Sequence, residues 1–164
     1  MGVEFNADEI FEMAEQIERN GAKFYRKAAE GFEGSGTRDT LLNLASWEDQ
    51  HLKIFSNMRA NLPDKDRGWE MFDPEGQAAM YLRAMADGHV FDVKTDPSEK
   101  LTGKETLEEI YRTALGLEKD SIVFYQGIRE MVPERLGRNK IDDVIKEEMR
   151  HVTILSNQLT SLKP

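Results

Sequence analysis

The sequence predicts an all-α protein, a four-helix bundle made of two antiparallel helix hairpins with a long crossover that contains a short extra helix. Apolar residues recur at every third or fourth position through four long stretches, which is the pattern of amphipathic helices. Glycine or proline separates the first stretch from the second and the third from the fourth, which predicts two tight turns. The weakly periodic segment 63–101 is long enough to cross the bundle.

The composition is that of a globular protein without a membrane or nucleic-acid partner. The 164 residues, 39% of them apolar and 32% charged, suit a single domain over 1–164. No apolar run approaches the roughly 18–20 residues that span a bilayer, and no signal-peptide pattern begins the chain, so a cytoplasmic location is expected. The absence of cysteine excludes disulfides and thiolate-bound metals. A formal net charge of −9 argues against nucleic acid.

Local signals place the helix starts. The first helix is predicted over 7–32, where Asn6 and Glu9 form a capping box and Phe5 and Ile10 a hydrophobic staple. The other helices are predicted over 37–62, 74–88, 103–131 and 139–162. Their start signals are Asp73-Pro74 for the short helix, a Thr102–Glu105 capping box for the third long helix, and Asn139 for the last.

Two glutamate–histidine pairs occupy positions where the helical pattern requires core residues. Glu48 and His51 lie in the apolar stripe of the second helix, and Glu148 and His151 lie in that of the last. Because residues three apart are neighbours on a helix surface, each pair shares one face. Buried carboxylates and imidazoles must be neutralised, hydrogen-bonded or bound to a metal.

An internal repeat with an offset of one hundred residues relates the two pairs. It also matches 17–25 with 117–125 and so pairs Glu18 with Glu118. In an antiparallel hairpin, residues equidistant from the turn lie at one level. Glu18 and Glu48 are equidistant from the first predicted turn. Glu118 and Glu148 are equidistant from the second. All four glutamates are therefore expected at one level, with a histidine one turn along in each hairpin.

Such a cluster of acidic groups indicates a two-metal site. Carboxylates a few ångström apart raise each other's pKa, and uncompensated buried charges destabilise the fold. Two divalent cations would balance four carboxylates, with both histidines neutral. Oxygen-rich ligation with one imidazole for each metal suits iron or manganese better than a structural zinc site.

One glutamate from each of two helices, with Glu-x-x-His from each of the other two, is the di-iron carboxylate pattern of the ferritin-like superfamily. The sequence resembles the rubrerythrin branch, specifically its stand-alone di-iron domains without a rubredoxin domain. The resemblance covers nearly the whole chain and implies six metal ligands: Glu18, Glu48, His51, Glu118, Glu148 and His151. It also implies that Glu18 and Glu118 are terminal ligands, and that Glu48 and Glu148 bridge the metals.

The same resemblance implies supporting residues and shows two departures. Tyr25 and Tyr125 resemble the tyrosines that hydrogen-bond to ligating carboxylates, which implies that they assist catalysis. Ser121 stands where rubrerythrins carry an additional glutamate. The chain also lacks the four cysteines of a rubredoxin domain, so electrons would come from an external donor.

The resemblance therefore implies an oxidoreductase with two iron ions per chain that acts on hydrogen peroxide or dioxygen and scavenges oxidants under oxidative stress. Manganese is an alternative metal, and zinc could replace iron in a purified sample. An external electron-transfer protein is the expected partner, and a homodimer is the expected assembly. The alternatives are a ferroxidase or other iron-handling protein, a di-manganese catalase-like enzyme, and a structural bundle without chemistry.

Other conspicuous residues have simpler explanations. His89, near the end of the predicted short helix, would interact favourably with the helix dipole and is not expected to bind metal. Trp47 and Trp69 are expected to be core or interface residues and not cofactor contacts.

Overall fold

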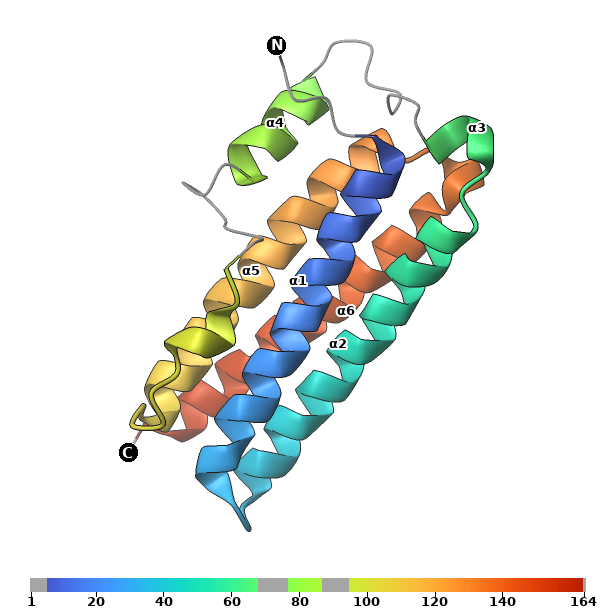
Figure 1. Ribbon diagram of the computed structural model, residues 1–164. Helices are drawn as coiled ribbons and strands as arrows, with labels where there is room; N and C mark the ends of the chain where they lie inside the picture. The colour runs from blue at the N-terminus through green and yellow to red at the C-terminus, as the bar shows by residue number, and fades with distance from the viewer. Residues whose placement is uncertain (1–5, 68–76, 87–94, 164) are drawn as a thin grey trace.

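A computed structural model describes residues 6–67, 77–86 and 95–163 of the chain. Its four long helices run side by side as a bundle (Figure 1). They are α1 (Ala7–Ala29), α2 (Gly36–Ala60), α5 (Leu107–Met131) and α6 (Arg138–Ser161). α1 packs against α2, and α5 against α6, as two antiparallel hairpins, and the chain between α2 and α5 crosses over from one hairpin to the other. The predicted all-α four-helix bundle is confirmed.

Short helices connect and cover the bundle. They are η1 (Glu30–Phe32), α3 (Asp64–Arg67), α4 (Gln77–Ala86), η2 (Pro97–Lys100) and η3 (Glu134–Leu136). α4 lies against α5, where the Tyr81 hydroxyl donates a hydrogen bond of 2.7 Å to the Val123 carbonyl oxygen. η2 lies on α1, where the Lys27 ammonium donates to the Ser98 carbonyl oxygen at 2.8 Å. Within the described ranges, no helix is both long and apolar enough to cross a membrane.

The start of α1 agrees with the sequence, but the starts of the other hairpin's helices do not. The capping box of Asn6 and Glu9 is present at α1. α6 begins at Arg138, and no side chain caps its first turn. Gly137, directly before it, has a φ of 98°, a left-handed backbone conformation that glycine adopts without strain. Asn139, predicted at about the start of this helix, is its second residue and does not cap it.

The predicted start of the third long helix at 103 was wrong, because a second capping sequence follows it. The Thr102 hydroxyl does donate to Glu105, at 2.8 Å, but Gly103 between them has a φ of 83°, which turns the backbone out of a helical path. The helix starts after Thr106, which forms a complete capping box with Glu109.

Several predictions fall on residues outside the described ranges. They concern Phe5, Trp69, Asp73, Pro74 and His89. A short helix was predicted over 74–88, and its described part, residues 77–86, forms α4.

Two apolar clusters fill the bundle and leave a polar level between them. One cluster contains Phe11, Phe55, Phe124 and Ile128, and the other contains Phe24, Leu41, Tyr111 and Leu155. Along each of the four long helices, the predicted metal ligands lie between residues of one cluster and residues of the other. Apolar packing therefore closes the bundle above and below the polar level.

Candidate metal centre

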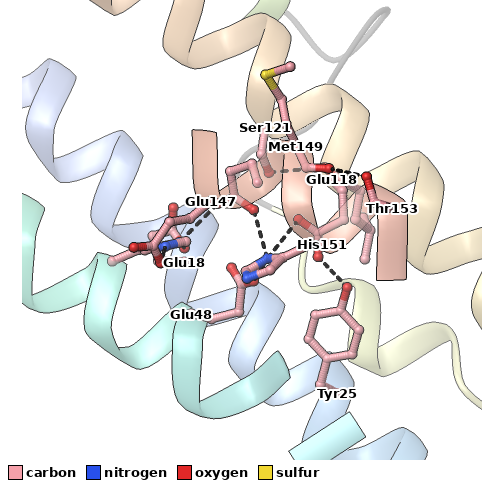
Figure 2. Close-up of polar contacts among 12 residues, drawn as sticks. Glu18, Tyr25, Glu48, Glu118, Ser121, Glu147, Met149, His151 and Thr153 are labelled. Atoms are coloured by element: carbon pink, nitrogen blue, oxygen red, sulfur yellow. Dashed lines mark hydrogen bonds and ion pairs between the residues drawn. The ribbon is translucent and has the colours of Figure 1, made fainter. Parts of the chain in front are cut away.

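The six predicted ligands, three from each hairpin, meet at this polar level, and Figure 2 shows four of them converging. None is more than 4% exposed. They form two groups, and within each group the potential ligand atoms lie within 4.8 Å of one another. The groups are Glu18, Glu48, His51 and Glu148, and Glu48, Glu118, Glu148 and His151. Because Glu48 and Glu148 belong to both, we name the groups by their unshared residues: the Glu18/His51 position and the Glu118/His151 position.

Each histidine turns its Nδ1 atom toward one carboxylate of its own hairpin and one of the opposite hairpin. His51 Nδ1 lies 3.0 Å from Glu148 Oε1 and 3.5 Å from Glu18 Oε2. His151 Nδ1 lies 3.1 Å from both Glu48 Oε1 and Glu148 Oε2. The two imidazole rings stack with their centroids 5.5 Å apart. One nitrogen of each ring therefore points at the place where a metal would sit.

Several atoms of the centre are buried and make no hydrogen bond of suitable geometry, although some of them lie 3.1 Å apart. They are Glu18 Oε2, Glu48 Oε1, Glu148 Oε2, and both ring nitrogens of His151. An unpaired buried polar atom costs about 1–3 kcal/mol, so a fold rarely keeps several together without another ligand for them. Carboxylate oxygens with one imidazole nitrogen at each position form a donor set that iron or manganese accepts. The residues present fit two such ions.

Burial and mutual repulsion alter the protonation of the metal-free centre. Burial, and then the nearby Glu118 and Glu18 carboxylates, raise the pKa of Glu48 well above its usual range. Burial and the Glu48 carboxylate raise the pKa of Glu148 to about 8. Burial alone would lower the pKa of His51, but its contacts with Glu148 and Glu18 outweigh burial and raise that pKa to about 12. The metal-free site therefore retains protons that a divalent ion would displace.

Two buried tyrosines hold the unshared glutamates across the bundle. The Tyr25 hydroxyl of α1 donates to Glu118 of α5, and the Tyr125 hydroxyl of α5 donates to Glu18 of α1. Burial, and then the neighbouring carboxylates, raise the pKa of both phenols well above the usual value, so both remain protonated donors. The exchange is reciprocal, as expected from the hundred-residue repeat.

Glu147 and Trp47 also contact the centre, although neither was identified as functional from the sequence. Glu147 Oε2 lies 3.1 Å from His51 Nε2. The Trp47 indole stacks on the His151 imidazole, with centroids 5.3 Å apart and planes 19° apart. Both residues stand directly before a Glu-x-x-His motif, and the repeat pairs them. The repeat marks these flanking positions as equivalent, but it does not show which atoms they contact.

A cavity of about 180 Å³ reaches the centre between α1, α5 and η2. It is lined by Ile17, Asn20, Gly21, Tyr25, Glu48, Thr95, Pro97, Lys100, Leu117, Glu118, Asp120 and Ser121. Gly21 forms part of its wall, where a Cβ atom would lie 3.1 Å from Glu48 Oε2. Since Glu118 lines the cavity and Glu18 does not, the cavity opens onto the Glu118/His151 position.

No protein-family model and no curated protein matches the chain. Among solved structures, the chain is similar to a proposed ferritin-like diiron-carboxylate protein from Thermotoga maritima. The two are 20% identical, with a TM-score of 0.71, over 99% of this chain and 100% of that chain. Sequence identity at this level establishes the fold alone, which is a ferritin-like bundle.

Proposed function

We propose that this chain binds two metal ions, iron in the cell, and reduces hydrogen peroxide or dioxygen with electrons from an external protein. The observation that carries the proposal is the pair of buried donor groups that share Glu48 and Glu148 and contain atoms without hydrogen-bond partners. The ferritin-like fold supports it, and so does the similarity to the Thermotoga maritima protein, which is described as a diiron-carboxylate protein.

In this proposal Glu48 and Glu148 would contribute ligand atoms to both positions, and each unshared glutamate–histidine pair would complete one position. Bound iron supplies reversible change between its ferrous and ferric states, which is what reduction of an oxidant requires. Tyr25 and Tyr125 orient the unshared carboxylates by donating to one oxygen of each. The apolar clusters exclude water from the ligands above and below the polar level, and the cavity reaches them from the side.

The cavity supplies the route for a small oxidant. Its volume of about 180 Å³ holds several water-sized molecules, since about 10–15 Å³ of such volume is enough for one water, and it therefore admits peroxide or dioxygen. Ser121 on this route is uncharged, and its hydroxyl donates to the Leu117 carbonyl oxygen at 2.9 Å. Lys100 also lines the cavity and places a positive side chain in a wall that otherwise contains the acidic residues Glu48, Glu118 and Asp120.

Iron oxidation is the second candidate function, and Asp120 favours it. This carboxyl group lines the same cavity as Glu118 and adds an acidic group on the way to the centre that would attract a ferrous ion. Burial raises the pKa of Asp120. In this case ferrous ion would be the substrate, and it would be released or stored after oxidation.

Anaerobic reconstitution followed by separate mixing with peroxide and with dioxygen tests the proposal. We expect about two ions per chain, given six ligands of this class, and oxidation of the ferrous protein that stops at the stoichiometry of the site. Re-reduction by an added electron donor should then restore reactivity. Oxidation of ferrous ion far beyond that stoichiometry would favour the ferroxidase. Protein that binds no metal would overturn both.

A further inference from the structure

The two histidines of the centre meet different partners on the side away from the carboxylates. His51 Nε2 contacts the Glu147 carboxylate at 3.1 Å, whereas His151 Nε2 is buried without a hydrogen-bond partner. The ring of Trp47 covers His151 instead. The repeat that duplicates the ligands therefore fails at the paired positions 47 and 147.

This difference changes what each imidazole offers a metal. A histidine that binds through Nδ1 carries its proton on Nε2 and can donate it to a further acceptor. A carboxylate acceptor fixes the ring orientation and makes the ligating nitrogen more basic, and its loss typically costs 10- to 100-fold in metal affinity. Only His51 has such an acceptor among the described residues.

The charges around the two positions differ in the same direction. Glu147 adds a carboxylate beside His51, with its side chain 44% exposed and therefore partly screened. Near His151, the Arg150 guanidinium lies 4.9 Å from the centroid of the Trp47 ring that covers the imidazole. Of these two groups, the Glu147 carboxylate favours a cation at the Glu18/His51 position, and the Arg150 guanidinium disfavours one at the Glu118/His151 position. The cavity opens onto the Glu118/His151 position, where solvent and small ligands can compete for the ion.

We propose that the two metal positions are unequal and that Glu147 is the positioning residue that makes them so. The Glu18/His51 position binds its ion first and more tightly. The Glu118/His151 position, which faces the cavity, binds second and exchanges its ion more readily. The inference rests on the proposed function, because it requires a centre that binds two ions.

Calorimetric titration of the metal-free full chain with Co²⁺ tests this order. The wild-type protein should bind in two steps whose affinities differ by at least 10-fold. Glu147→Ala should weaken the tight step by 10- to 100-fold and bring the two affinities together. The affinity of the tight step in Glu147→Gln should lie between those of the wild-type protein and Glu147→Ala. Asp143→Ala is the matched control, because it removes a carboxylate one turn away on α6 that pairs with Lys146 and not with a histidine. It should leave both steps unchanged.

Ligand variants identify which step belongs to which position. His51→Ala should abolish the tight step, and His151→Ala should abolish the weak one, with circular dichroism used to select folded protein. The inference would be overturned, with the proposed function left standing, by any of three results. These are two equal steps in the wild-type protein, an unchanged tight step in Glu147→Ala, or loss of the weak step in His51→Ala and of the tight step in His151→Ala. Wild-type protein that binds fewer than two ions would overturn both.

Discussion

The two hairpins supply matching ligands but surround them with different residues. Each contributes two glutamates, one histidine and one tyrosine at positions one hundred residues apart. Toward the cavity, however, Gly21 faces Glu48 where its counterpart Ser121 bonds to its own helix. The difference teaches that the repeat duplicates the metal-binding set, whereas the residues packed against that set give the two positions separate properties.

The largest effect should come from removing a carboxylate that belongs to both positions. Glu48→Ala should reduce metal content from about two ions per chain to below one, whereas Glu18→Ala should leave about one, because it deprives a single position of a donor. Metal analysis after anaerobic reconstitution measures both. Equal losses in the two variants would contradict the sharing of Glu48.

Chelation of both ions should lower the melting temperature by roughly 10–20 °C. Free metal at about 100 times the dissociation constant contributes about 2.7 kcal/mol for each site, and a protein of this size shifts by about 2–4 °C per kcal/mol. Differential scanning calorimetry with and without chelator gives the shift. The Glu18→Ala variant should lose about half of it, and a variant that kept the full shift would break the link between this residue and metal binding.

The metal-free protein should become less stable as pH rises from about 5 to 9. The pKa of Glu148 is raised from 4.5 to about 8, so the stability it contributes is present below 4.5 and is lost as pH rises toward 8. The pKa of His51 is raised from 6.5 to about 12, so its contribution also declines above 6.5. The lowered pKa of Glu118 acts below 4.5, outside this range.

Melting temperatures of chelated protein across this pH range measure the effect. The metal-loaded protein should show the opposite trend, because protons compete less with metal at higher pH. A melting temperature of the chelated protein that rises with pH would show that the carboxylates are not protonated in the fold.

The smallest effects should come from the tyrosines, and they should cross between hairpins. Tyr25→Phe should weaken binding at the Glu118/His151 position, and Tyr125→Phe at the Glu18/His51 position, each by about 10-fold. Co²⁺ titration resolves the two steps. Tyr111→Phe is the control, because this buried phenol contacts Gln158, away from the ligands. If Tyr25→Phe and Tyr125→Phe weakened the same step, the crossed arrangement would be contradicted.

Periodicity predicted the four long helices because each carries a continuous apolar face that the bundle buries. Helix starts were less predictable where two capping sequences follow each other. Thr102 with Glu105 and Thr106 with Glu109 satisfy the same rule, and the backbone conformation at Gly103 selects the second. Local sequence does not decide which of the two capping boxes starts the helix, because the choice depends on the direction in which the chain approaches α5.

The sequence by itself determined the architecture, the level at which the polar residues meet and the six residues that meet there. Helical spacing and distance from a turn are properties of the chain alone, so counting was sufficient. Only the tertiary structure decided that Glu147 contacts His51, that Trp47 covers His151 and that a cavity opens onto the Glu118/His151 position. These features depend on contacts between hairpins and with the crossover, where side-chain packing, and not periodicity, determines which atoms touch.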